Sequence, residues 1–212
     1  MEIQTFTFNP FLENTYVLYD ASGECIVIDA GCYDDGERTE LVSFIEKEQL
    51  TPVKLVNTHC HIDHVLGLQF LAEKYQLELW FHEKDMPVFE STERVAQMYG
   101  IPNVQLPPNP AGFIAEGEKV EFGNSSLDIL FTPGHSPGHI VLVNHLQKQI
   151  IGGDVLFYGS IGRTDLPGGN HATLIDSIKS KLFPLGDDYQ VFSGHGPVTN
   201  IGFERTSNPF LQ

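Results

Sequence analysis

The chain has 212 residues, 41% of them hydrophobic and 19% charged, which is typical of one globular domain with a sizeable core. No segment approaches the roughly 18 apolar residues that span a membrane, and the N-terminus lacks the basic start and apolar run of a signal peptide, so we expect a cytoplasmic protein. The formal net charge of −16 disfavours binding to the phosphate backbone of nucleic acids.

Stretches with strand and helix patterns follow one another in clusters. Residues 1–30 alternate as strands do, with segments 16–19 and 25–28 separated by a turn at Ser22-Gly23. Asp34 or Asp35 can cap a helix that carries Leu41, Phe44 and Ile45 on one face. Further strands are predicted over 53–56, 77–81, 119–122, 127–131, 140–143, 149–151 and 190–192, and further helices over 67–75, over 92–99 and after Asn170. This order predicts an α/β fold of two sheets with helices packed outside them.

Four potential metal ligands follow the predicted strand 53–56 within six residues: His59, His61, Asp63 and His64. Residues two apart on an extended segment point the same way, so His59 and His61 can face one metal ion together. Asp63 and His64 come at the following turn and can face a second ion. Imidazole and carboxylate ligands suit zinc, and also iron or manganese. The cluster therefore predicts a metal site, from which Cys60 points away.

Three more candidate ligands each stand in a glycine-rich turn after a predicted strand. They are His135 in TPGHSPGH, Asp154 in GGD and His195 in GHGP. Glycine lets the backbone turn tightly and approach a ligand closely, and strand ends of a rigid sheet can bring distant residues to one point. The remaining histidines, including His139, are expected in structural, packing or surface positions. The cysteines form no CxxC pair, so we expect free thiols, with Cys25 and Cys32 buried.

The ordered set of Asp29, THCHIDH, His135, Asp154 and His195 resembles the metallo-β-lactamase superfamily, and within it the glyoxalase II-like hydrolases. The resemblance runs from Asn14 to the C-terminus. It implies a four-layer αβ/βα sandwich of two mixed sheets with helices outside, formed by residues 1–212 as a single metallo-hydrolase domain, with metal ions at one edge between the sheets.

The resemblance also implies a division of roles among the ligands. His59, His61 and His135 would hold one metal ion, Asp63, His64 and His195 a second, and Asp154 would bridge both. Asp29 resembles a carboxylate that orients ligands without binding metal. Asp63 and Asp154 are the expected catalytic carboxylates, with Asp63 acting as a ligand rather than as a proton acceptor.

The implied reaction is hydrolysis of a small-molecule thioester such as S-lactoylglutathione. Two divalent metal ions, most simply zinc, can share a water and lower its pKa toward neutrality, so that a bridging hydroxide is the nucleophile. The segment 159–169, GSIGRTDLPGG, is similar to a small glyoxalase II-like branch without the helical C-terminal domain that grips glutathione. Only the 17 residues 196–212 follow His195 here, so we expect weak glutathione specificity. Arg163 and Asp165 are expected to pair with each other at the site edge, and Tyr158 is a candidate lining residue or a packing residue.

Two other functions compete with this one. The GRTD phrase also resembles the persulfide dioxygenases, which use one iron ion held by the equivalents of His59, His135 and Asp154; the LPGG continuation favours the hydrolase. A non-catalytic scaffold with structural metal ions is opposed by the open, seven-ligand set, because structural zinc sites are normally closed. Asp154 counts against a β-lactamase and the acidic composition against a tRNA-processing nuclease, so neither nucleic acid nor membrane is an expected partner.

Overall fold

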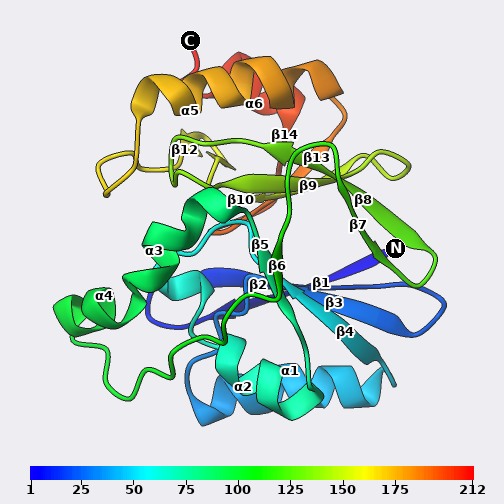
Figure 1. Ribbon diagram of the computed structural model, residues 1–212. Helices are drawn as coiled ribbons and strands as arrows, with labels where there is room; N and C mark the ends of the chain where they lie inside the picture. Colours follow the sequence, from blue (N-terminus) through cyan, green and yellow to red (C-terminus); the bar gives the residue numbers. More distant parts are fainter.

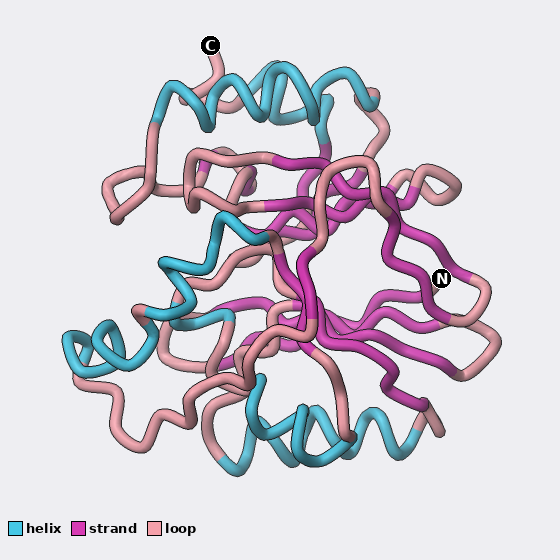
Figure 2. Tube along the Cα trace, in the orientation of Figure 1, coloured by secondary structure: helices cyan, strands magenta, loops and turns pink.

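Two six-stranded sheets lie face to face in the computed structural model, which describes residues 1–212, and helices cover their outer sides (Figures 1 and 2). The first sheet runs in the order β1 (Glu2–Phe8), β2 (Glu13–Tyr19), β3 (Glu24–Ile28), β4 (Thr51–Val56), β5 (Leu79–Phe81) and β6 (Gly112–Phe113). Its first three strands are antiparallel, and β3 to β6 are parallel.

The second sheet has the order β14-β13-β10-β9-β8-β7. Its strands are β7 (Lys119–Phe122), β8 (Ser125–Phe131), β9 (Ile140–Asn144), β10 (Gln149–Gly153), β13 (Gln190–Ser193) and β14 (Thr199–Asn200). All neighbours are antiparallel except β10 and β13. A small hairpin of β11 (Leu156–Phe157) and β12 (Ser160–Ile161) stands apart from both sheets.

Helices α1 (Asp35–Lys47) and α2 (Leu68–Tyr75) cover the first sheet, and α5 (His171–Ser177) and α6 (Ile201–Ser207) cover the second (Figure 1). A π-helical stretch, Ile178–Leu182, extends α5. Short 3-10 turns occur at Ile62–His64, Glu83–Asp85 and Phe183–Leu185. Two further helices, α3 (Met86–Glu90) and α4 (Thr92–Tyr99), lie beside the sheets at one edge. No helix combines the length and the apolar character needed to cross a membrane.

Three hydrophobic clusters lie between the four layers. A strand with both faces buried sends alternate side chains into the clusters on its two sides. In β3, Cys25 and Val27 belong to the cluster under α1 and α2, whereas Ile26 and Ile28 belong to the cluster between the sheets. The third cluster packs β9, β10 and β13 against α5 and α6. The predicted α/β sandwich of two mixed sheets with helices outside is thus confirmed.

The helix starts predicted from the sequence are present. Asp34 caps α1 by accepting a hydrogen bond of 2.9 Å from the N–H of Glu37, and Asn170 caps α5 by accepting one of 2.9 Å from the N–H of Thr173. Two short helices were not predicted. Pro87 stands in the first turn of α3, where its missing N–H costs nothing, and α6 has only seven residues, too few for a clear periodic pattern.

The strand directions explain where the site lies. The parallel strands β3 and β4 end at the same edge of the first sheet, as do β8, β10 and β13 in the second. The candidate ligands all follow one of these strands: Asp29 follows β3, residues 57–64 follow β4, and His135, Asp154 and His195 follow β8, β10 and β13. Carboxyl ends of strands therefore bring segments far apart in the chain to one edge.

Candidate metal centre

The first group of candidate ligands consists of His59, His61 and His135, whose ring nitrogens converge. Nε2 of His135 lies 3.2 Å from Nε2 of His59 and 2.8 Å from Nδ1 of His61. His59 is fully buried and His135 almost so. Three imidazoles that face one another at these distances present their lone pairs to a single point, as a metal ion requires.

The second group consists of Asp63, His64 and His195. Nε2 of His195 lies 3.1 Å from Oδ2 of Asp63, and Nε2 of His64 lies 3.6 Å from the same oxygen. Asp63 and His64 belong to the 3-10 turn Ile62–His64. This turn directs them to a different point from the one that His59 and His61 face.

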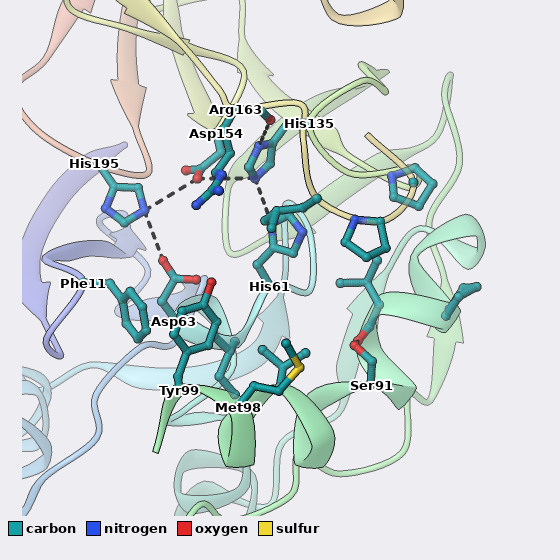
Figure 3. A pocket seen from close by; sticks show the side chains of 18 of the residues that line it. Phe11, His61, Asp63, Ser91, Met98, Tyr99, His135, Asp154, Arg163 and His195 are labelled. Atoms are coloured by element: carbon teal, nitrogen blue, oxygen red, sulfur yellow. Dashed lines mark hydrogen bonds and ion pairs between the residues drawn. The ribbon is translucent and has the colours of Figure 1, made fainter. Parts of the chain in front are cut away.

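Asp154 lies between the two groups (Figure 3). Its Oδ2 is 3.5 Å from Nε2 of His135 in the first group and 3.5 Å from Nε2 of His195 in the second, and its Oδ1 is 3.5 Å from Nε2 of His64. Position 194 requires glycine, since a Cβ there would meet Oδ1 of Asp154 at 2.1 Å. Position 153 also favours glycine, because the φ of Gly153 is +46°, in the left-handed region.

The electrostatics of His59, His61 and Asp154 suit cation binding. Burial lowers the pKa of His59, and burial together with His135 lowers the pKa of His61 to about 3, so both rings are neutral and keep a free lone pair at physiological pH. Burial alone would raise the pKa of Asp154, but the nearby His64 and His135 hold it below its ordinary value. The carboxylate is therefore ionised.

Asp29 supports the cluster from behind. Its Oδ1 accepts a hydrogen bond of 2.7 Å from the N–H of Thr58, its Oδ2 accepts one of 2.6 Å from the Thr58 hydroxyl, and Oδ2 lies 3.1 Å from Nδ1 of His64. The residue has a φ of +52°, a left-handed conformation that is uncommon outside glycine and is often found at functional sites. His139 supports the other side, where its Nε2 accepts a hydrogen bond of 3.0 Å from the N–H of Asp154.

Two buried carboxylates near the cluster were not predicted. Asp85 accepts hydrogen bonds from the N–H of Cys60 at 2.6 Å, from the Ser136 hydroxyl at 2.5 Å and from the N–H of Gly138 at 2.7 Å. Glu13 is fully buried, with Oε1 3.9 Å from Nδ1 of His64. Neither residue belongs to a recognisable motif, so only the tertiary contacts identify them.

The segment 159–169 lies at the edge of the cluster. Arg163 and Asp165 form the expected pair, with Nε to Oδ1 at 2.7 Å and Nη2 to Oδ2 at 2.8 Å. The backbone carbonyl of Arg163 also lies 2.7 Å from Nδ1 of His135, so it fixes this ring with Nε2 facing the other ligands. Tyr158 does not line the site; its ring stacks on Phe203 at a centroid distance of 4.8 Å.

The remaining histidines and cysteines lie where packing or exposure was expected. His82 stacks on Phe131, His145 lies 2.8 Å from the Tyr189 hydroxyl, and His171 is exposed. All three cysteines are free and buried, and Cys60 packs in the core beneath the first sheet rather than toward the metal centre. The chemistry of the site therefore rests on imidazole and carboxylate groups.

The cluster forms the floor of a cavity of about 940 Å³. Five of the candidate ligands line it: His61, Asp63, His135, Asp154 and His195. His59 and His64 lie behind them and are fully buried. The cluster is thus open to a small molecule on one side and held by packed protein on the other.

A sandwich of two mixed sheets, with several histidine and aspartate groups able to bind metal ions in an arrangement consistent with a dinuclear site, defines a metallo-hydrolase. The family model described as the metallo-beta-lactamase superfamily matches residues 8–195. The chain belongs to the metallo-beta-lactamase superfamily.

Among known relatives, the chain is 41% identical to a protein of Haemophilus influenzae named hydroxyacylglutathione hydrolase GloC, with 100% of this chain and 98% of that protein covered. Among solved structures, it is similar to TTHA1623 in a di-iron-bound form, at 35% identity with a TM-score of 0.88, covering 98% of this chain and 100% of that one. It is also similar to the BLEG-1 B3 metallo-beta-lactamase, at 33% identity with a TM-score of 0.90, covering all of both chains.

Proposed function

We propose that the protein is a dinuclear metal-dependent hydrolase of small-molecule thioesters of the glyoxalase II type. The single observation that carries this proposal is the place of Asp154, whose carboxylate lies 3.5 Å from histidine nitrogens of both ligand groups. His59, His61 and His135 would hold one metal ion, Asp63, His64 and His195 the other, and Asp154 would touch both.

The residues present fit two divalent metal ions. Nε2 of His64 and Oδ1 of Asp154 are buried without a hydrogen-bond partner, and a buried polar atom without a partner costs free energy. Nitrogens of the first group face one another at 2.8 and 3.2 Å. A cation at each point would satisfy these atoms, and nitrogen with carboxylate ligands suits zinc, iron and manganese.

When bound, two such metal ions activate water near neutral pH and polarise a carbonyl group. The chain itself supplies the rest of the site. Buried His59 and His64 keep the ligand set rigid, whereas His61, Asp63 and Asp154 line the cavity floor and so lie where the reacting bond must be placed. No cysteine faces the cavity, so no covalent thiol intermediate is involved. A thiolate is a good leaving group that departs without a strong general acid.

Two relatives support the proposal. The Haemophilus influenzae protein carries a hydroxyacylglutathione hydrolase name at 41% identity, and TTHA1623 holds two iron ions at 35% identity. The second activity to be tested is β-lactam hydrolysis, because a relative described as a B3 metallo-beta-lactamase matches this chain over its full length. The third is persulfide oxidation, for which the GRTD phrase at 162–165 is the sequence signal.

The test is a comparison of kcat/KM for thioesters of glutathione, coenzyme A and a simple alkyl thiol, with a β-lactam and a persulfide as competing substrates. We expect hydrolysis of S-lactoylglutathione with a high KM and a preference over the other thioesters below roughly 1,000-fold, about 4 kcal/mol of differential transition-state binding. No thioester hydrolysis, together with turnover of the β-lactam or oxygen uptake with the persulfide, would replace the proposed function.

A further inference from the structure

The cavity above the metal centre is larger than a reacting thioester bond requires. Its volume of about 940 Å³ is near the upper end of the roughly 300–1,000 Å³ found for small-molecule sites. Helices α3 and α4 form one wall and residues 157–168 form the other, with the candidate ligands at the floor. The walls must therefore contact parts of the substrate that do not react.

The helical wall is apolar. Val88 of α3 and Val95, Met98 and Tyr99 of α4 all line the cavity, and residues 95, 98 and 99 share one face of α4 by their spacing. Met98 is 78% exposed and Tyr99 51%. Figure 3 shows Met98 and Tyr99 rising from the helix toward the cavity, opposite His135 and Arg163. Large apolar side chains left uncovered at the mouth of a cavity mark a binding surface.

The charged residues in the walls are all cations. Apart from Asp63 and Asp154 at the floor, the ionised side chains that line the cavity are those of Lys84, Arg94 and Arg163. Arg163 is paired with Asp165, so Lys84 and Arg94 are the two wall cations that make no ion pair, in a chain with 28 acidic residues and 12 Lys and Arg residues. These two cations would attract an anion.

Arg94 is the free member of this group. The other three arginines of the chain are each paired with a carboxylate, as Arg38–Asp35, Arg163–Asp165 and Arg205–Asp187. Lys84 has its ammonium 4.7 Å from the centre of the Phe131 ring. Arg94 has neither an ion pair nor a side-chain hydrogen bond, and it stands on α4 beside the apolar face. Its guanidinium is left to bind a ligand, and its planar fork matches a carboxylate or a phosphate.

We propose that Arg94 and the apolar face of α3 and α4 form a specificity subsite for the thiol carrier of the substrate, with Arg94 binding an anionic group of that carrier. This inference rests on the proposed thioesterase function. A small acyl group such as lactoyl is uncharged and lies at the metal centre, so the anion belongs to the carrier. The carboxylates of glutathione and the phosphates of coenzyme A are the two sources of that anion.

The experiment compares Arg94→Gln and Arg94→Lys with Lys179→Gln, which removes an exposed cation outside the cavity that makes no ion pair. One acyl group is presented on glutathione, on coenzyme A and on a neutral alkyl thiol. In Arg94→Gln we expect KM for a charged carrier to rise about tenfold, the size of a charge-assisted hydrogen bond, with kcat nearly unchanged. The ratio of kcat/KM between charged and neutral thioesters falls by the same factor.

A loss confined to glutathione identifies a carboxylate as the partner of Arg94, and a loss confined to coenzyme A identifies a phosphate. Arg94→Lys should restore part of the ratio, because it keeps the charge but not the fork, and Lys179→Gln should leave it unchanged. An unaltered ratio in Arg94→Gln with both carriers would overturn the subsite.

A binding measurement separates this inference from the proposed function. Calorimetric titration of the metal-loaded protein with S-methylglutathione and with coenzyme A needs no turnover. We expect Arg94→Gln to weaken the binding of one of them about tenfold. Absence of thioester hydrolysis with retained, Arg94-dependent binding would remove the thioesterase function and keep the subsite, whereas equal binding by both proteins, or no binding at all, would remove the subsite.

Discussion

The carboxylate of Asp85 accepts a hydrogen bond of 2.6 Å from the backbone N–H of Cys60, which stands between the candidate ligands His59 and His61. The other oxygen of Asp85 accepts hydrogen bonds from the Ser136 hydroxyl and the N–H of Gly138, one and three residues after His135. One buried side chain therefore joins the two loops that supply the first ligand group. All three partners of Asp85 are donors, and they leave no place for a donor on the side chain itself.

Asp85→Asn should weaken the hydrogen bonds that hold these two loops together. The amide would place an N–H against one of the donors, and a buried polar clash misaligns the loops. We expect metal affinity or kcat to fall about 10- to 100-fold, as for other residues that orient ligands. Equilibrium dialysis against zinc and steady-state kinetics measure this, with Glu83→Gln, an exposed change two residues away, as control. Equal metal binding and activity in both variants would show that Asp85 only stabilises the fold.

Asp154→Ala should have a larger effect. Asp154 alone lies between the two ligand groups and supplies negative charge there. Its loss should remove at least one metal ion and nearly all hydrolysis, more than the about 10- to 100-fold typical of residues behind the ligands. The matched control is Asp176→Ala, on the exposed side of α5. Near wild-type turnover in folded Asp154→Ala would mean that the site is wrongly assigned.

A third prediction concerns the junction between the two sheets at the turns before β3 and β8. Asp20 accepts hydrogen bonds from the Ser22 and Ser125 hydroxyls at 2.6 and 2.7 Å and from the N–H of Asn124 at 2.8 Å. Slight burial raises its pKa, but these hydrogen bonds outweigh that effect and hold the pKa below the ordinary value of 3.8. Folding therefore favours the ionised form.

The resulting stability is complete above the ordinary pKa and is lost as the pH falls through the lower, folded-state value. Asp20→Asn should cost about 1 kcal/mol at neutral pH, a value that allows for the partial exposure of the group. The difference from wild type should shrink in acid below 3.8. Urea unfolding of both proteins at neutral and acid pH checks this; a difference independent of pH would rule out the ionised carboxylate as its cause.

The candidate metal ligands could be identified from the sequence because their signals are local. The four candidates of residues 59–64 follow one predicted strand, and His135, Asp154 and His195 stand in glycine-rich turns that sequence alone reveals. The two sheets were predicted from the order of strand and helix patterns along the chain, and the four-layer sandwich from the resemblance to the superfamily; the structure confirms both, and in β3 successive side chains enter different cores. Local periodicity also predicted α1, α4 and the start of α5.

The supporting residues could not be predicted because their contacts are long-range. Asp85 stands in the charged run Glu83-Lys84-Asp85, which by composition resembles a solvated turn, and it is buried only because loops 25 and 51 residues away pack around it. Tyr158 is a candidate lining or packing residue by sequence; in the structure its ring stacks on Phe203 of α6, a helix that the sequence did not predict. Arg94 belongs to no recognisable sequence motif, and only the structure shows that it lines the cavity.

The metal content of the purified protein tests the central claim most directly. Elemental analysis should be made on protein purified without added metal and again after zinc supplementation. From the seven convergent candidate ligands we expect two metal ions per chain, zinc or zinc mixed with iron. A content that stays at one iron ion per chain after zinc supplementation would contradict the dinuclear hydrolase and favour the persulfide dioxygenase.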